Sequence, residues 1–252
     1  LNRMFRERCD AGWYSRTMKK LQDDITILLV MWDYIPEDEV EEQLQVLQLH
    51  LYEAGILLFY NEEDPLRCSG STLDDALIFF TEALHLAPVA YGTDQHISTL
   101  ASLTQIGKIY KEKSMYNDAL MVFDRALALS YQLEHFGDGV DEASLSACNA
   151  TVLRCLGDIR REMGCMDHAV QVYKRALQYY KMGEIDQDHF DEMLEILQLI
   201  GTLTMKLFGT ESREAAEYFE LACLLKDADE GKFNIRLVID SANNSPPLAL
   251  SS

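Results

Sequence analysis

The chain has 252 residues, of which 42 are acidic and 22 are basic, so its formal net charge is −20. Hydrophobic residues make up 48% of the chain, which is typical of a globular protein rather than a disordered one. The negative charge argues against a nucleic-acid-binding protein and against docking on anionic lipid, because both need clustered Lys and Arg. The longest apolar run, residues 25–32, is far shorter than the roughly 20 residues of a membrane-spanning helix, so we expect no membrane insertion.

The first part of the chain is divided by charge. Residues 1–20 contain six basic and two acidic side chains, whereas residues 21–66 contain twelve acidic side chains and no Lys or Arg. We expect residues 1–42 to form a basic arm and an N-terminal capping helix, the helix spanning roughly residues 10–34. The acidic part has two interpretations: a surface that attracts a basic partner or a second copy of the chain, or a solvated helix face.

An internal repeat follows, because residues 103–129 and 153–179 align without gaps. Each contains a Leu, an apolar-Gly pair, an Ala twelve residues after the Gly, an aromatic residue four later and a second Ala three later. These positions are Leu103, Ile106, Gly107, Ala119, Phe123 and Ala126 in the first segment and Leu153, Leu156, Gly157, Ala169, Tyr173 and Ala176 in the second. The second half of the pattern recurs as Ala76, Phe80 and Ala83, and as Ala215, Phe219 and Ala222.

The spacing predicts pairs of packed helices. The Leu, the apolar residue and the Gly lie on one stripe of a first helix, and we expect the Gly to let a neighbouring backbone come close. The Ala, aromatic and Ala positions form the matching stripe of a second helix. Each pair exposes an apolar flank that the next pair can cover, so the units stack into a solenoid.

These residues resemble the tetratricopeptide repeat over about residues 43–226. The glycines at positions 55, 107, 157 and 201 are 52, 50 and 44 residues apart, longer than the basic unit of about 34, and such long units look like the kinesin-light-chain class. The resemblance implies an all-α fold, a right-handed α-solenoid of about four helix-turn-helix units. The chain departs from the family pattern in two ways. The first unit contains an inserted loop at residues 61–72, and the Pro that ends each unit in the family occurs here only as Pro88.

No motif for catalysis or metal binding is present, so we expect no enzyme activity, no metal and no cofactor. The six cysteines include no C-x-x-C pair and lie mostly among helical apolar positions. We expect them to be reduced, as in the cytoplasm.

The resemblance also implies where a partner binds, because tetratricopeptide proteins bind peptides in a concave groove lined by the first helix of each unit. Counted from the glycines, the groove would contain Thr104 and four cations, and its apolar end in the first unit would contain Ile56 and Phe59. The cations are Lys108 and Lys111 in the second unit and Arg154 and Arg161 in the third. The residues expected to contact the partner are Tyr52, Gln105, Lys108, Lys111, Arg154, Arg161 and Gln198. Such a groove suits a protein or peptide with acids beside a bulky apolar residue. Alternatively, the four cations pair with neighbouring acids such as Glu112, Asp158 and Glu162.

The repeat pattern ends at residue 226, and we expect residues 227–252 to form an extended or disordered tail. Within it, residues 233–240 (FNIRLVID) alternate apolar and polar residues, which is typical of a strand. We expect this stretch to lie extended against the last helix pair or in the groove.

Three functions remain open from the sequence. The first is a non-enzymatic scaffold that binds a partner segment in the groove. The second is a structural subunit of a larger complex, held through its convex acidic face and N-terminal arm. The third is the targeting module of a longer enzyme whose catalytic part lies elsewhere. The pattern identifies neither the partner nor the process.

Overall fold

A computed structural model describes residues 34–60, 70–136, 140–182 and 187–229, together with short helical pieces at 19–21, 23–27 and 30. The predicted basic arm, most of the loop at 61–72, and residues 230–252 with the strand-like stretch lie outside the described residues. All the regular elements in the described ranges are helices, so the predicted all-α class is confirmed.

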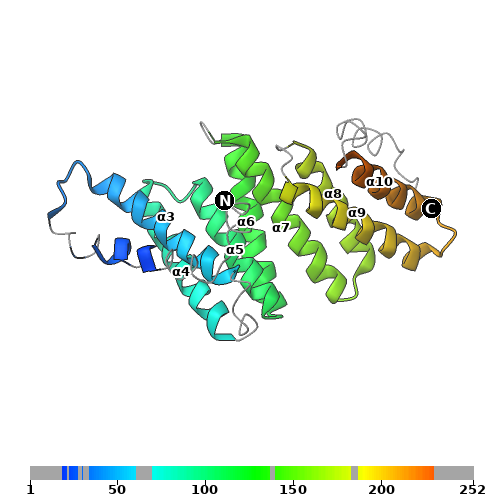
Figure 1. The fold of residues 1–252 in the computed structure, drawn as a ribbon, viewed down its shortest axis with the longest axis horizontal. Coiled ribbons are helices and arrows are strands. Elements are labelled where there is room, and N and C mark those ends of the chain that lie inside the picture. The colour runs from blue at the N-terminus through cyan, green and yellow to red at the C-terminus, as the bar shows by residue number, and fades with distance from the viewer. Residues whose placement is uncertain are drawn as a thin grey trace. The chain divides into compact units, whose positions relative to one another are not determined.

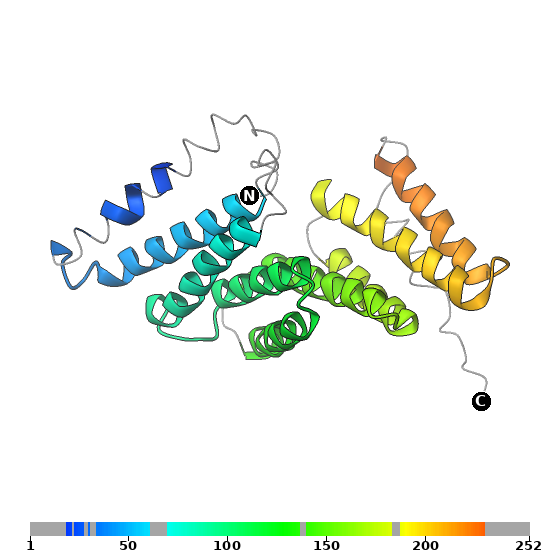
Figure 2. The ribbon, with the colours of Figure 1, turned by 90° about the horizontal axis from the view of Figure 1, so that it is seen from below.

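Within the described residues 40–229, eight long helices follow one another along the chain (Figure 1). They are α3 (Val40–Phe59), α4 (Gly70–Ala90), α5 (Ile97–Glu112), α6 (Tyr116–Phe136), α7 (Glu142–Glu162), α8 (Met166–Met182), α9 (Gln187–Phe208) and α10 (Arg213–Asp229). Neighbours along the chain pack together, as the pairs α3–α4 and α9–α10 show in both views (Figures 1 and 2). The chain divides into two compact units, residues 1–148 and 149–252, with the boundary inside α7.

Each helix pair is held by an aromatic ring of the second helix that lies against the glycine of the first. A Cβ atom added to Gly55, Gly107 or Gly157 would lie less than 3.0 Å from three carbons of the facing ring. The rings belong to Phe80, Phe123 and Tyr173 respectively, and all three are fully buried. The predicted close approach at the glycines is therefore that of a side-chain ring and not of a backbone. The rings are large, and only a residue without a Cβ leaves room for them.

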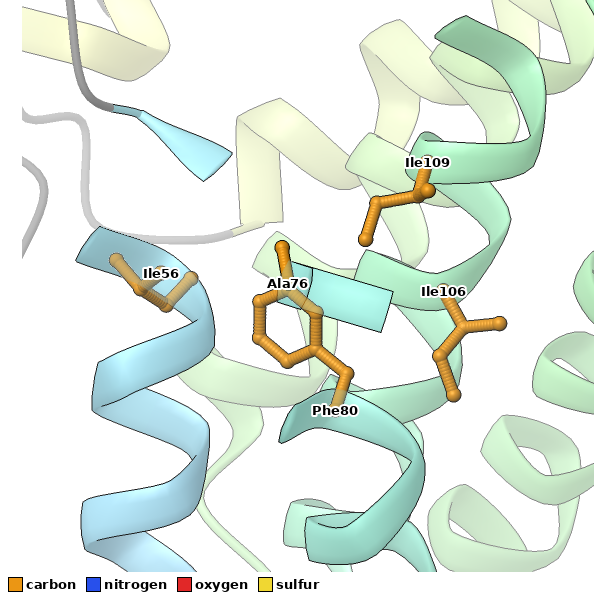
Figure 3. Packing of buried hydrophobic residues seen from close by; sticks show 5 residues of the cluster. All are labelled: Ile56, Ala76, Phe80, Ile106 and Ile109. Carbon is orange, nitrogen blue, oxygen red and sulfur yellow. The ribbon is translucent and has the colours of Figure 1, made fainter. Parts of the chain in front are cut away.

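The next helix along the chain completes the core of each pair. In the first unit, Phe80 of α4 lies between Ile56 of α3 and Ile106 of α5, with Ile109 close by (Figure 3). Helix α5 thus covers the flank that α3 and α4 leave open, which is the stacking that the repeat predicts. The prediction placed Ile56 in the groove, but it is 4% exposed and belongs to this core.

The turns inside two pairs have the same construction. The Met115 amide donates to the Tyr110 carbonyl, and the Cys165 amide donates to the Arg160 carbonyl, at 2.9 and 2.8 Å. The turn residue has φ of 58° at Ser114 and 80° at Gly164. This six-to-one hydrogen bond with a left-handed residue is the Schellman ending of a helix. It ends the first helix sharply and lets the second run back along it.

Two element boundaries differ from what proline positions suggest. Pro36 begins a turn, closed by the Glu39 amide on the Pro36 carbonyl, and α3 itself starts at Val40. Pro88 lies within the last turn of α4, which continues to Ala90, rather than ending the helix.

Helix α5 begins with an unusual cap, His96. The Ser98 amide donates to Nδ1 of His96 at 3.2 Å, and the imidazole stacks on the ring of Tyr91 with 3.7 Å between ring centres. Nδ1 accepts a hydrogen bond only when it carries no proton. Burial lowers the pKa of His96 below its usual value of 6.5, which keeps the ring neutral at pH 7.

The cap makes the stability of α5 dependent on pH. Because the pKa is lower in the folded chain, the unfolded chain binds more protons, and the stabilisation present above pH 6.5 is lost as the pH falls through the folded pKa. We expect a loss of ~1 kcal/mol or less, since the ring is partly exposed. His96→Asn supplies a cap that does not titrate. Urea unfolding of both chains at several pH values should show the extra loss only with His96, and parallel curves would contradict the assignment.

Candidate partner-binding surface

The residues predicted to bind a partner come from both compact units. Tyr52, Gln105, Lys108 and Lys111 belong to residues 1–148, on α3 and α5. Arg154, Arg161 and Gln198 belong to residues 149–252, on α7 and α9. The two sets are described in turn.

In the first unit, Tyr52 connects the core to the polar side of α5. Its ring packs edge-on against Phe80, with 5.5 Å between ring centres, and its hydroxyl accepts a hydrogen bond from Nε2 of Gln105 at 3.3 Å. Burial raises the pKa of the Tyr52 hydroxyl above its usual value, so it stays protonated and neutral. The pair Tyr52–Gln105 joins the first helices of two successive units.

Lys108 makes a second contact between these helices. Its ammonium donates to the hydroxyl of Tyr60, the residue that follows α3, at 2.6 Å. Two effects act on the pKa of the Cys148 thiol. Burial raises it and the charge of Lys108 lowers it, and because burial is the larger effect the pKa is raised to about 11. Lys111, one helical turn further on, pairs with exposed Glu112 at 3.5 Å.

Thr104, which the prediction placed in the groove beside Lys108, does not face solvent. It is 2% exposed, and its hydroxyl donates to the Leu100 carbonyl of its own helix at 2.8 Å. Helix α5 is packed against both α4 and α6. Its solvent-facing stripe is therefore narrower than the three positions that helical spacing alone suggests.

In the second unit, Arg154 is clamped by two glutamates of α9. It forms an ion pair with Glu192 at 3.1 Å and another with Glu195. The Tyr180 hydroxyl donates to the second oxygen of Glu192 at 2.6 Å. Burial disfavours the charge of Arg154, but the two glutamates outweigh it and hold its pKa above the usual value. This arrangement stabilises the α7–α9 packing within the unit.

Arg161 has weaker partners. It contacts Glu162 at 3.1 Å and Asp158 at 4.0 Å, and all three residues belong to α7. Asp158 accepts a hydrogen bond from the Tyr173 hydroxyl at 2.6 Å, so the ring that fills the Gly157 position also fixes this carboxylate. Gln198 is exposed on α9.

Of the two expectations about the cations, the binding of a partner stays a prediction. The pairing of Lys111 and Arg161 with Glu112, Asp158 and Glu162 is present. Sequence reasoning did not identify the contacts across helices, which involve Tyr60, Tyr180, Glu192 and Glu195. The only sequence signal for the clamp was two acids three residues apart on one helix, which is common on solvated faces.

In the described ranges, no group of three or more His, Cys, Asp or Glu side chains could hold a metal ion. None of the helices between residues 34 and 229 has the length and apolar character needed to cross a membrane.

Comparison with known proteins identifies the class of fold. The structure of BtubC (BKLC) from P. vanneervenii matches with a TM-score of 0.54 at 17% identity, covering 95% of this chain and 97% of that chain. The yeast histone chaperone Hif1, described as a scaffold protein recruiting protein complexes to core histones, matches with a TM-score of 0.41 at 16% identity, covering 92% and 98%. The Hif1 likeness is too small to support an inference. No protein-family model and no curated sequence matches the chain.

The helix pairs and the match to BtubC establish a tetratricopeptide-repeat-like fold, an all-α scaffold of consecutively packed helix pairs. This match shows the fold, and the tetratricopeptide-like fold that the repeats implied is confirmed.

The clamp predicts unequal costs for replacing the two arginines of α7. Arg154→Met leaves half-buried Glu192 without its counterion and should lower the free energy of unfolding by about 1–3 kcal/mol. Arg161→Met is the matched control on the same helix and should cost less than ~1 kcal/mol, because Glu162 is exposed. Equal losses in urea unfolding would show that the clamp adds nothing to stability.

Proposed function

We propose that the chain is a non-enzymatic scaffold that binds a segment of a partner protein along the first helices of its repeats. The observation that carries this proposal is the pair of cross-helix hydrogen bonds, Gln105–Tyr52 and Lys108–Tyr60. They join the Tyr52 hydroxyl of α3 and the Tyr60 hydroxyl, just after α3, to the Gln105 amide and the Lys108 ammonium of α5. The tetratricopeptide-like fold favours a protein partner, because proteins of this fold bind peptides on the surface lined by the first helices of their repeats.

The composition of this surface suggests the chemistry of the partner. Lys108 and Lys111 are partly buried, and a carboxylate that approaches them is attracted more strongly than on an open surface. Tyr52 and Phe59 offer aromatic surface for one bulky apolar side chain. The proposed ligand is therefore an acidic segment with a bulky apolar residue. Arg154, Arg161 and Gln198 are the corresponding candidates on the first helices of the second unit.

The alternative is a subunit built permanently into a larger complex. It is favoured by the acidic side chains at positions 37, 38, 39, 41 and 42, all of which are exposed around the start of α3. Such a surface suits a basic neighbour. The mass of the native species distinguishes the two: a species near 28.8 kDa favours the scaffold, and a large salt-resistant one favours the subunit.

A reducing, cytoplasm-like compartment fits both proposals. Cys148, Cys165 and Cys223 are present as thiols. Reduced cysteines are usual for proteins that work inside cells.

Selection from a random peptide library against the whole chain tests the scaffold proposal. Enriched peptides should combine Asp or Glu with a bulky apolar residue, and their binding should weaken with salt. The double variant Lys108→Glu, Lys111→Glu should lower their affinity by about ten-fold or more, because like charges then face each other. Arg125→Glu, an exposed change on α6, is the matched control and should bind normally. Basic consensus peptides, or equal binding by both variants, would overturn the assignment.

A further inference from the structure

The last helix pair has an open flank. On α8, the residues one, eight and eleven positions after the first repeat alanine are buried, and they are Val170, Leu177 and Tyr180. The residues at the same three positions of α10 are Ala216, Cys223 and Lys226, and all of them are exposed. Helix α9 packs on α8, whereas no helix follows α10 in the described ranges. This flank of α10 is therefore the surface that a further unit of the solenoid would cover.

The repeat aromatic residue of α10 is also the least buried of the four. Phe80, Phe123 and Tyr173 are fully buried, whereas Phe219 is partly exposed. Helical spacing places Phe219 between Ala216 and Cys223 on one face. A ring with an uncovered edge keeps in water an apolar area that a neighbouring helix would remove.

The flank of α8 shows how such a surface holds its neighbours. Two of its polar groups reach the next helix pair: the Tyr180 hydroxyl donates to Glu192 of α9, and the Lys174 ammonium donates to Glu214 of α10, both at 2.6 Å. Tyr180 lies near the end of α8 and Glu192 near the start of α9, so α9 runs back along α8. The flank of a second helix therefore makes polar as well as apolar contacts with the element that covers it.

On α10, the positions of Lys174 and Tyr180 are taken by Glu220 and Lys226. Both residues are exposed, and neither forms an ion pair with another described residue. They carry opposite charges and lie six residues apart, about 9 Å along the helix, with Cys223 midway between them. An antiparallel helix on this flank would satisfy both charges if it carried the same two charges at the same separation.

We propose that the flank of α10 binds the same flank of a second copy of the chain, with the two α10 helices antiparallel and Cys223 facing Cys223 across a two-fold axis. Reversal about residue 223 places Glu220 of each copy opposite Lys226 of the other, so the ion pair forms twice. The small Cys223 side chain lets the helices come close at the axis. Phe219 is next to Glu220, and the second helix covers its open edge.

The charges select this occupant and this direction. A parallel pairing of the two helices would place Glu220 opposite Glu220 and Lys226 opposite Lys226, which is repulsive. A contact between two single helices is smaller than a standard protein–protein interface, so the dimer is weak, with a Kd on the order of micromolar or above. In a dilute extract the chain is then a monomer, and the mass test of the scaffold proposal is unaffected.

Sedimentation equilibrium of the whole chain, from about 1 µM to 1 mM, measures the association directly. The mass should rise with concentration from 28.8 kDa toward twice that value and no further, because a two-fold contact closes on itself. Added salt should weaken the dimer, because it screens the ion pairs. A monomer over the whole range, as expected if another part of the chain covers the flank, would overturn the proposal, and so would growth beyond a dimer.

Charge exchange locates the contact on α10. Glu220→Lys and Lys226→Glu, made singly, each create two like-charge contacts and should raise the Kd of the dimer about ten-fold or more. The double variant restores opposite charges in exchanged positions, and its Kd should return to within about three-fold of the original. Glu134→Lys, an exposed change on α6, is the matched control and should not weaken the dimer. Single variants that dimerise normally, or a double variant that does not recover, would contradict the assignment.

The thiol at the axis gives a second readout. Dioxygen with a copper–phenanthroline catalyst should oxidise two Cys223 thiols to a disulfide between copies, which mass spectrometry of the linked peptide detects. We expect this cross-link to form about ten-fold or more slowly in Glu220→Lys than in the unaltered chain at equal concentration. Equal rates would mean that Cys223 reacts through random collisions, and would overturn the proposed placement of the axis.

Discussion

The packing of each helix pair depends on an aromatic ring seated against a glycine. The ring of Phe123 occupies the volume that a side chain at position 107 would need, and the ring of Tyr173 does the same at position 157. A buried Phe or Tyr stabilises by removing a large apolar area from water, but only if the facing helix approaches closely. The glycine permits that approach and also fixes the register of the two helices. The spacing of glycine and ring along the chain therefore specifies one pairing and disfavours slipped ones.

The same contact positions the polar groups of the first helices. Lys108 and Asp158 each directly follow a glycine that faces a ring. Lys108 donates to the Tyr60 hydroxyl, and Asp158 accepts a hydrogen bond from the hydroxyl of Tyr173, whose ring lies against Gly157. The packing of the core therefore sets the positions of these polar groups. A change in how a ring packs against its glycine would shift Lys108 or Asp158 even though neither residue is replaced.

The helix pairs could be predicted from the sequence because they rest on local spacing. The glycine and the ring are 16 residues apart in both central pairs, Gly107–Phe123 and Gly157–Tyr173, and the outer pairs repeat the pattern at longer spacing. Solvent exposure on α3 and α5 was less predictable. Ile56 and Thr104 lie on the predicted stripe, yet both are buried, because the width of that stripe depends on neighbouring helices. The contact of Arg154 with Glu192 joins residues 38 positions apart, and no local pattern encodes it.

A double-mutant cycle tests the ring-on-glycine contact most directly, with Gly107→Ala and Phe123→Leu made singly and together and unfolding by urea followed for each chain. Gly107→Ala alone should be destabilising, because overpacking costs about 1–3 kcal/mol and exceeds the ~1 kcal/mol that Ala gains in a helix. In the Phe123→Leu background the clash is relieved, and the same Ala should become neutral or stabilising, with a coupling of about 1 kcal/mol or more. Free energies that add to within about 0.5 kcal/mol would show that the ring and the glycine act independently, which contradicts the account.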